Sequence, residues 1–343
     1  MREKKIIIIG AGLAGIEAAI NLSLKGHEVT IVEKESNIGG NISRWDHLFP
    51  TLRPASDILD YLESSLKSSS ANVLMNTKVE KLSVNANHHE VLLENGQLLK
   101  ADAVLIATGY QLFNASKKEE YGYGIYDNVI TSADLEQKFK EGKALTMSNG
   151  KEPKRIGFIH CVGSRDEKVG NTYCSKVCCI TGVKQAIELR MKLPRTEILC
   201  FYMDLRMFGK GYEELYKEAQ EKYAIQFIRG RLSEAAENID TSLQIKAEDT
   251  LSGRPLKMTV DLLVLLVGMV PSETTKKLAK MLNIKSDSND FIKVKDEYIS
   301  NNETGIQGVF VAGATTSPMS ISDTFADARA AAIKIEQYLN NLK

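Results

Sequence analysis

Short apolar runs rich in β-branched residues alternate along the chain with segments of helical periodicity. Residues 5–9 form the first apolar run, and this composition is typical of a buried parallel strand. Residues 28–32 and 101–109 are similar, whereas residues 56–67 carry apolar side chains at helical spacing. A second series of strand-like runs begins at residues 155–159. The pattern predicts an α/β chain built on parallel sheets.

Two of these runs resemble each other. Residues 101–109 and 260–268 each have a small residue or valine, then aspartate, an apolar strand and a glycine at the tip. We interpret them as an internal repeat of two Rossmann-like, nucleotide-binding-type lobes in tandem. After Pro271 the chain should return to the first lobe. The predicted lobes are residues 1–112 with 271–343, and residues 113–270.

A glycine-rich turn joins the first predicted strand to a helix. Gly10, Gly12 and Gly15 form the pattern G-x-G-x-x-G. The first glycine permits a tight turn, the second lets the backbone approach a pyrophosphate, and the third lets helix and strand pack closely. Glu33 follows the second strand, where an acid hydrogen-bonds a ribose hydroxyl. The motif predicts a dinucleotide site; a glycine turn that serves packing alone is the alternative.

Composition narrows the class of protein. The chain has 343 residues, 43% of them hydrophobic and 26% charged, which is typical of a soluble protein with a substantial core. The formal net charge of zero argues against a nucleic-acid partner. No apolar run is long enough for a membrane span, and no leader-like segment opens the chain, so we expect a cytoplasmic location. Cysteines there are expected as ligands, redox groups or buried thiols.

Four of the five cysteines lie close together in the sequence, at Cys161, Cys174, Cys178 and Cys179. When the two lobes are aligned by their first strands, residues 160–163 fall where residues 10–13 stand, and about a dozen residues are inserted before the next helix. The second nucleotide site is therefore predicted to be a thiolate site. By count, four thiolates suit zinc or an iron–sulfur cluster equally; a redox pair or inert thiols are further alternatives. Cys200 is expected to be a buried thiol.

Two separated segments that build one lobe around a middle lobe are the layout of the pyridine nucleotide-disulfide oxidoreductases, of which thioredoxin reductase is the compact form. The chain resembles this family in the glycine turn, in Glu33, in the Ala-Thr-Gly that ends at Gly109, and in Gly268 and Gly313. The resemblance implies FAD in a discontinuous first lobe. Ala314 stands where the family usually has an aspartate for the ribitol, so backbone N–H groups or another side chain must serve there.

The flavin site that this resemblance implies draws on several segments. The turn at Gly40 is expected over the pyrophosphate, Val79 near the adenine, and the start of the last helix at the isoalloxazine. Residues 41–54 are expected to cross the cofactor region. The full set of expected contacts is Gly10, Gly12, Ala14, Gly15, Glu33, Lys34, Gly40, Asn41, Val79, Thr108, Gly109, Gly313, Ala314 and Ile321.

A closer resemblance rests on three unusual stretches in one order: residues 160–166, the run Cys174…Cys178-Cys179, and residues 203–214. Together they resemble HdrA, the flavoprotein of heterodisulfide reductase, over nearly the whole chain. The resemblance implies FAD, a [4Fe–4S] cluster on the four cysteines, a homodimer, and electron transfer with other iron–sulfur subunits in sulfur or disulfide metabolism. The chain lacks the ferredoxin-type cysteine repeats of longer relatives, so it resembles the short form of the sulfur-oxidising heterodisulfide-reductase-like complexes.

The same resemblance places Lys184 near the flavin N5, where a cation would favour a reduced, anionic flavin. A solvated helix lysine is the alternative. Lys210 is a second candidate, with a surface role as its alternative, and His160 either orients a thiolate or lies in the core. Other polar residues are predicted to have no catalytic role: a loop ion pair of Arg165 with Asp166, and the surface residues His47, His88 and His89.

Two other classes of function compete with that of an electron-transfer flavoprotein. A stand-alone NAD(P)H-dependent disulfide reductase would need a phosphate cradle in the second lobe and a C-x-x-C or C-x4-C dithiol, and the sequence has neither. A non-catalytic flavin-bound scaffold would lose its cluster without loss of activity in the complex. No residue resembles a nucleophile for a sulfur substrate, so that chemistry is expected on another polypeptide of the complex.

Overall fold

The computed structural model describes residues 3–85 and 88–342. The chain divides into two compact units, which are residues 1–43, 56–111 and 270–343 (unit 1) and residues 44–55 and 112–269 (unit 2). These units differ from the predicted lobes chiefly in the segment 44–55, which packs with unit 2. Strands β10 (Tyr110–Leu112) and β19 (Met269–Pro271) span the points where the chain passes from one unit to the other.

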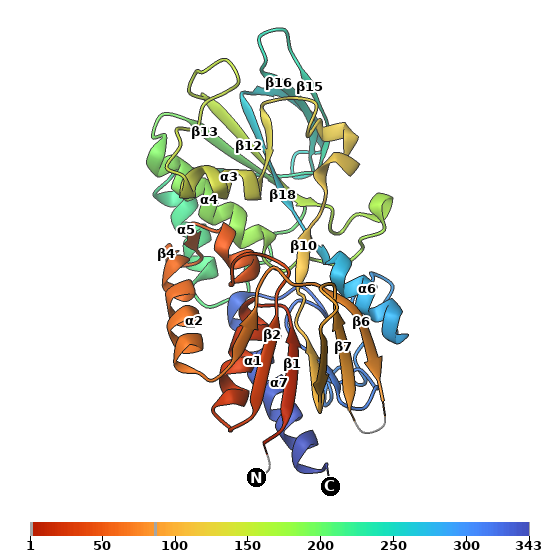
Figure 1. Ribbon diagram of the computed structural model, residues 1–343. Helices are drawn as coiled ribbons and strands as arrows, with labels where there is room; N and C mark the ends of the chain where they lie inside the picture. Colours follow the sequence, from red (N-terminus) through yellow and green to blue (C-terminus); the bar gives the residue numbers. More distant parts are fainter. Residues whose placement is uncertain (1–2, 86–87, 343) are drawn as a thin grey trace. The chain divides into compact units, whose positions relative to one another are not determined.

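Unit 1 is built on a five-stranded parallel sheet (Figure 1). The strands, in spatial order, are β20 (Val309–Val311), β9 (Ala103–Ile106), β1 (Lys5–Ile9), β2 (Glu28–Val32) and β5 (Asn72–Leu74). Ile6 and Ile8 point into one hydrophobic cluster, and Ile7 and Ile9 point into another. A strand buried on both faces explains why its sequence is apolar throughout rather than alternating.

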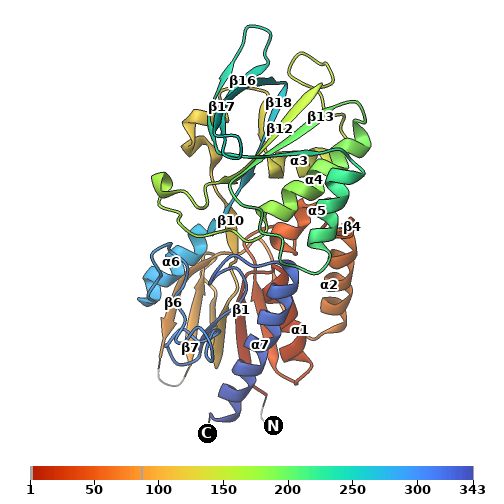
Figure 2. The ribbon, with the colours of Figure 1, turned by 180° about the vertical axis from the view of Figure 1, so that it is seen from behind.

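Different layers cover the two faces of this sheet. Helices α1 (Leu13–Ser23), α2 (Ser56–Ser68) and α7 (Ile321–Asn340) lie on one face (Figure 2). Alanines on α1 and α7 share the core there, and side chains this small let two helices approach closely. On the other face lie helix α6 (Glu273–Leu282) and the antiparallel strands β6 (Val79–Val84), β7 (His89–Leu93) and β8 (Leu98–Ala101).

Unit 2 contains a second five-stranded parallel sheet, with β11 (Val129–Thr131), β18 (Leu262–Val267), β12 (Arg155–Val162), β13 (Glu197–Tyr202) and β14 (Gln226–Arg229) in spatial order. Helices α3 (Ser132–Lys140), α4 (Cys178–Lys192) and α5 (Tyr212–Glu221) form a core with it. The short strands β3 (His47–Leu48) and β4 (Arg53–Pro54) pair with each other, and an antiparallel sheet is formed by β15 (Leu232–Glu237), β16 (Leu243–Asp249) and β17 (Arg254–Val260).

The two sheets confirm the predicted repeat. In each sheet the first strand of the βαβ unit is central, the second and third follow on one side, and the strand after the antiparallel insertion lies on the other. Thus β12 corresponds to β1, and β18 to β9. The fold class is therefore confirmed as α/β with two Rossmann-like sheets. Among the described residues, no helix has the length and hydropathy of a membrane span.

The connection after the first strand differs between the units. In unit 1, three residues (10–12) separate β1 from α1, whereas in unit 2 fifteen residues (163–177) separate β12 from α4. The helix predicted to begin at Lys184 begins at Cys178, so two of the four clustered cysteines lie in its first turn. The predicted insertion in the cysteine segment is confirmed.

The turn after β1 yields a prediction about stability. A methyl group added at Gly15 would lie 1.9 Å from the carbonyl oxygen of Gly10, whereas one added at Gly12 would meet nothing within 4 Å. The substitution G15A should therefore lower the free energy of unfolding by about 1–3 kcal/mol, because the turn must shift. G12A, measured with it by urea unfolding of protein stripped of nucleotide, should stay within about 0.5 kcal/mol of the wild type. Equal stability of the two variants would contradict this packing.

Candidate functional site

The sequence-predicted nucleotide residues of unit 1 gather at one edge of its sheet. Gly10 follows β1, Glu33 follows β2, Thr108 lies just beyond β9, and Gly313 lies just beyond β20. These are the carboxyl ends of parallel strands, where α/β sheets bind their ligands. The structure thus brings together residues that are more than 300 positions apart in the sequence.

The glycine turn leaves room for a ligand above its second glycine. Gly10 has φ 109°, and a methyl group there would lie 2.5 Å from the Ala107 carbonyl oxygen. At Gly12 no atom lies within 4 Å of the position a methyl group would take. Glu33 is buried, and its Oε2 accepts a hydrogen bond of 2.6 Å from the Ala11 N–H. The open position and the anchored acid fit a dinucleotide on the helix N-terminus.

A second glycine pair closes over this turn. Gly39 donates its N–H to the Ala11 carbonyl at 2.8 Å, and a methyl group at Gly40 would lie 3.1 Å from the Gly12 Cα. Asn41 donates to the carbonyl of Tyr110 at 2.8 Å. Lys34, by contrast, is exposed and pairs with Glu35 at 3.5 Å.

The other predicted cofactor residues have polar partners of their own within unit 1. The hydroxyls of Thr108 and Thr275 lie 2.7 Å apart, and Gly109 donates its N–H to the Thr315 hydroxyl at 3.1 Å. Val79 is buried, with its carbonyl 3.5 Å from the Lys277 ammonium. Ile321 is the first residue of α7.

Asp327 is a residue that the sequence analysis missed. It lies on α7, nearly buried, and its Oδ2 accepts the Gly313 N–H at 2.6 Å while Oδ1 accepts from Asn302 at 2.9 Å. Burial raises the pKa of its carboxyl, and the bonds from Gly313 and Asn302 oppose this. An acid within the alanine-rich segment is the signal that could have identified it. With alanine at position 314, an acid reaches the Gly313 turn from the helix instead.

The cysteine cluster is the candidate site of unit 2. Cys161 lies one residue before the end of β12 with φ 60°, Cys174 lies in the inserted loop, and Cys178 and Cys179 begin α4. Three of these thiols are buried, and Cys174 is partly exposed. A non-glycine residue at positive φ is strained, and such strain persists only where the surroundings hold it. The strand end, the loop and the helix start thus present their thiols together.

Polar groups of unit 2 already address these sulfurs. The Lys176 N–H donates to Cys174 Sγ at 3.3 Å. The thiols of Cys178 and Cys179 donate to the carbonyls of Val267 and Asp204 at 3.8 and 3.7 Å.

Burial raises the pKa of the Cys161 thiol to about 12, and it also raises the pKa values of Cys178 and Cys179. Charge on neighbouring sulfurs raises these pKa values as well, so the four sulfurs are close enough to interact electrostatically. Such thiols become thiolates only when a metal centre compensates their charge.

The inserted loop is anchored by a buried ion-pair network. Asp166 is 1% exposed, and its Oδ2 lies 2.7 Å from both Lys118 Nζ and Arg231 Nη2. Burial alone would raise the pKa of Asp166, but these two cations lower it. The predicted ion pair of Arg165 with Asp166 is wrong, because Arg165 instead donates to Asp204 at 2.7 Å. Neighbouring residues in a loop point to different partners, which sequence spacing does not specify.

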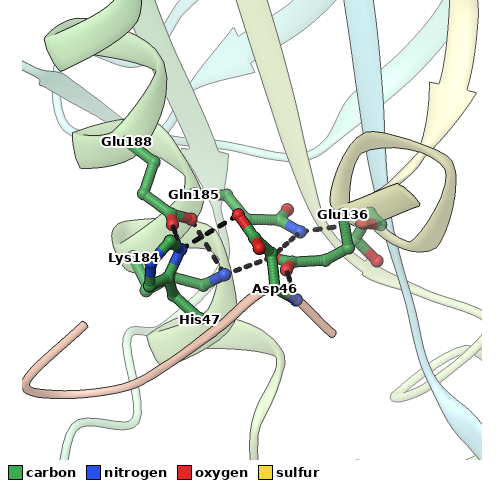
Figure 3. A network of polar contacts seen from close by, with 7 residues as sticks. Asp46, His47, Glu136, Lys184, Gln185 and Glu188 are labelled. Atoms are coloured by element: carbon green, nitrogen blue, oxygen red, sulfur yellow. Dashed lines mark hydrogen bonds and ion pairs between the residues drawn. The ribbon is translucent and has the colours of Figure 1, made fainter. Parts of the chain in front are cut away.

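Lys184, the predicted catalytic residue, is buried in a polar network of unit 2 (Figure 3). It forms an ion pair with Glu136 on α3 and lies 2.9 Å from Glu188 one turn along α4. The Gln185 amide donates to Glu136 at 2.8 Å. The alternative interpretation of Lys184 as a solvated lysine is therefore wrong, while its approach to a flavin stays a prediction.

The segment 44–55 completes this network. His47 Nδ1 lies 2.9 Å from Glu188 Oε1 and 3.0 Å from Asp46 Oδ2. The three ligand-capable atoms of Asp46, His47 and Glu188 lie within 4.8 Å of one another, but Lys184 already neutralises Glu188. Burial raises the pKa of Glu188, and Lys184 opposes it. The prediction of His47 as a surface residue is wrong, since its ring is held by two carboxylates.

The remaining predicted side chains lie as follows. His160 is buried, and burial lowers its pKa to about 3, so the ring is uncharged; among the described residues neither nitrogen has a hydrogen-bond partner. His89 is also buried, in β7, which corrects its prediction as a surface residue, whereas His88 pairs with Glu90 at 3.1 Å. Lys210 is exposed. Cys200 is buried in mid-strand, as predicted.

Comparisons with known proteins agree with this architecture. The family of pyridine nucleotide-disulphide oxidoreductases matches residues 4–109. An iron-sulfur subunit of the CoB-CoM heterodisulfide reductase of Methanopyrus kandleri is 35% identical over 96% of this chain and 63% of its own length. The corresponding polypeptide of the H(2)/formate:CoB-CoM heterodisulfide,ferredoxin reductase of Methanococcus maripaludis is 32% identical with the same coverage.

The chain is homologous to the HdrA flavoprotein of heterodisulfide reductase. It spans 63% of the length of these curated relatives. Among solved structures, thioredoxin reductases of Lactococcus lactis and T. acidophilum match 99% and 100% of the chain with TM-scores of 0.68 and 0.67 at 17% and 16% identity. At this identity they show the thioredoxin-reductase-like fold. Both predicted resemblances, to HdrA and to the thioredoxin reductase fold, are confirmed.

The buried carboxyl of Glu188 makes stability depend on pH. Because burial raises its pKa in the folded state, the folded protein binds this proton more tightly than the unfolded chain does. The stabilisation is full below the unfolded pKa of about 4.3 and is lost as pH rises through the folded pKa. E188Q removes this loss. Its free energy of unfolding relative to the wild type, from urea unfolding, should therefore rise between about pH 4.5 and about pH 7.5.

The matched control is E218Q, which removes a half-exposed carboxylate from a helical pair with Lys222 on α5. Its stability relative to the wild type should change little over the same range, because exposed pairs contribute little. A relative stability of E188Q that stays flat or falls with pH would contradict the buried network.

Proposed function

We propose that the chain is an electron-transfer flavoprotein of the heterodisulfide reductase type, an oxidoreductase component that holds FAD in unit 1 and a [4Fe–4S] cluster in unit 2. Cys161, Cys174, Cys178 and Cys179 are the proposed cluster ligands. The observation that carries the proposal is their convergence at the strand end where unit 1 has its glycine turn. The same position of a repeated fold thus presents open glycine backbone in one unit and four thiols in the other.

The chemistry of the four sulfurs supports a metal centre. Their pKa values are raised by burial and by one another, so four thiolates without a cation would be strongly destabilised. An N–H group directed at Cys174 Sγ is the kind of hydrogen bond that tunes iron–sulfur clusters. Relatives from Methanopyrus kandleri and Methanocaldococcus jannaschii carry the words iron-sulfur in their names, which agrees with this assignment.

The spacing of the sulfurs favours a cluster over zinc. Tetrahedral zinc, with Zn–S distances of about 2.3 Å, places its four sulfurs about 3.8 Å from one another. Among these four cysteines, all of which the structure describes, no three have their sulfurs within 4.8 Å of one another. A cubane cluster separates its thiolates more widely, because irons and sulfides stand between them.

The glycine turn of unit 1 supports FAD. The family of pyridine nucleotide-disulphide oxidoreductases matches residues 4–109, which contain the turn, Glu33 and Gly109. Gly10, Gly12, Gly15 and Gly40 would lie against the pyrophosphate, and Glu33 would hold a ribose. Lys34, Asn41, Val79, Thr108, Gly313, Ala314 and Ile321 remain proposed contacts.

When bound, FAD would exchange electrons in pairs and the cluster singly, which lets such a protein connect two-electron and one-electron partners. The protein's own part is to shield the thiols and to hold charge near them. Lys184 remains the proposed cation near the flavin, with Glu136 and Glu188 fixing its ammonium group. We further propose, from the resemblance, a homodimer in the cytoplasm with iron–sulfur partner proteins that act on sulfur compounds.

The principal test is metal analysis of cysteine variants. Protein prepared or reconstituted without oxygen should contain about four irons and four acid-labile sulfides per chain, with visible absorption that dithionite bleaches. Alanine at position 161, 174, 178 or 179 should remove most of this iron. C200A is the matched control: its thiol lies buried in β13, and it should keep the iron. One zinc per chain, or equal loss in C200A, would contradict the proposal.

The flavin site is tested separately. G12A fills the open position above the second glycine without a clash, so it should keep the fold but lose most of its FAD. Flavin absorbance per chain after gel filtration measures this, and circular dichroism checks the fold. G26A, in the turn before β2, is the control and should keep its flavin. Full FAD occupancy in G12A would contradict a pyrophosphate at this turn.

A further inference from the structure

Arg165 belongs to the inserted loop between Cys161 and Cys174. Its backbone has φ 53°, and its N–H donates to the Tyr173 carbonyl at 2.8 Å. A non-glycine residue at positive φ keeps this conformation only where its surroundings fix it. The side chain is 20% exposed, so most of the guanidinium is removed from water. The loop therefore turns this residue inward at a cost to its backbone.

The two ends of the Arg165 guanidinium have different surroundings. Nη2 donates to Asp204 Oδ2 at 2.7 Å, and the backbone carbonyl of Asp204 accepts the thiol of Cys179 at 3.7 Å. Nη1 is buried, and within the described part of the chain it has no hydrogen-bond partner. A buried charged donor without an acceptor is costly, and such groups are rare unless an ion or ligand completes them.

The orphaned nitrogen belongs to a guanidinium that acts on the cysteines. Burial raises the pKa of the Cys161 thiol while Arg165 lowers it, and Arg165 acts in the same direction on Cys179. A neutral thiol is a weak acceptor, whereas a thiolate or a sulfide carries negative charge and accepts strongly. Nη1 would thus gain its missing acceptor when the four sulfurs hold an iron–sulfur centre.

We propose that Arg165 is a positioning residue for the cluster, with Nη1 donating to a sulfur of the Cys161 corner and offsetting the negative charge there. The inference rests on the proposed function. One electron added to the cluster, with no bond made or broken, increases its negative charge. A buried cation beside it stabilises that added charge more than an exposed one. Arg165 therefore raises the reduction potential of the cluster.

Other charged groups near this loop allow matched controls. Arg229 also pairs with Asp204, at 3.4 Å, but its side chain is 48% exposed and its Nε donates to the Met203 carbonyl. R229Q thus removes a guanidinium from the same carboxylate without removing the orphaned donor. Arg206 lowers the pKa of Cys179 but is exposed, so its effect is screened by water.

The test is a dye-mediated titration with dithionite, read by electron paramagnetic resonance, on the reconstituted full chain. R165Q should keep its iron but shift the ratio of reduced to oxidised cluster about tenfold toward the oxidised form at a fixed potential. For a one-electron couple this is about 59 mV to more negative values. R165K, which keeps the charge, should lie between R165Q and the wild type. R229Q should match the wild type, and D204N, which removes an anion, should not shift to more negative values.

Each result decides the inference. R165Q with full iron and the wild-type potential would overturn it, and so would an equal shift in R229Q. If R165Q holds no iron, R165K decides: iron retained in R165K supports the charge's role, and iron lost there shows a role in loop structure alone. A wild-type chain that holds no iron after reconstitution overturns the proposed function, and this inference falls with it, so the two failures are distinguishable.

Discussion

The cost of gathering four buried thiols in one place is the constraint on which unit 2 depends. Burial raises the pKa of Cys161 to about 12, and the neighbouring sulfurs act in the same direction. Without a compensating centre the thiols stay protonated, and the buried Arg165 Nη1 has no acceptor among the described residues. A metal–sulfur centre would relieve both costs, because it stabilises thiolates and supplies acceptors. This shared relief connects the strained backbone of the loop to the proposed chemistry.

The repeated fold explains where this site arises. Both sheets have the same strand order, and in both the first strand ends at the edge where parallel sheets bind ligands. In unit 1 a turn of three residues leads to the helix, which leaves the backbone open above Gly12. In unit 2 an inserted loop of fifteen residues occupies the same place, held down by Asp166, Lys118 and Arg231. Length and anchoring of one connection thus separate a nucleotide cradle from a thiol site.

The sequence was sufficient where local pattern determines structure. Apolar runs predicted the central strands, the glycine motif predicted the turn after β1, and the match of residues 101–109 with 260–268 predicted the repeat. It was insufficient where side chains find distant partners. Asp166 pairs with residues 48 positions before it and 65 after it, and His47 reaches Glu188. Such pairs follow from tertiary packing, and no periodicity in the sequence encodes them. The same holds for the segment 44–55, whose polar composition indicated a loop but not the unit it packs with.

The central claim is that these four sulfurs share one iron–sulfur centre. Crystals of the chain grown without oxygen, with diffraction recorded on both sides of the iron absorption edge, test it most directly. The account predicts anomalous density from a compact group of irons bounded by the sulfurs of Cys161, Cys174, Cys178 and Cys179. A single metal atom among those sulfurs, or well-ordered thiols with no anomalous density between them, would contradict it.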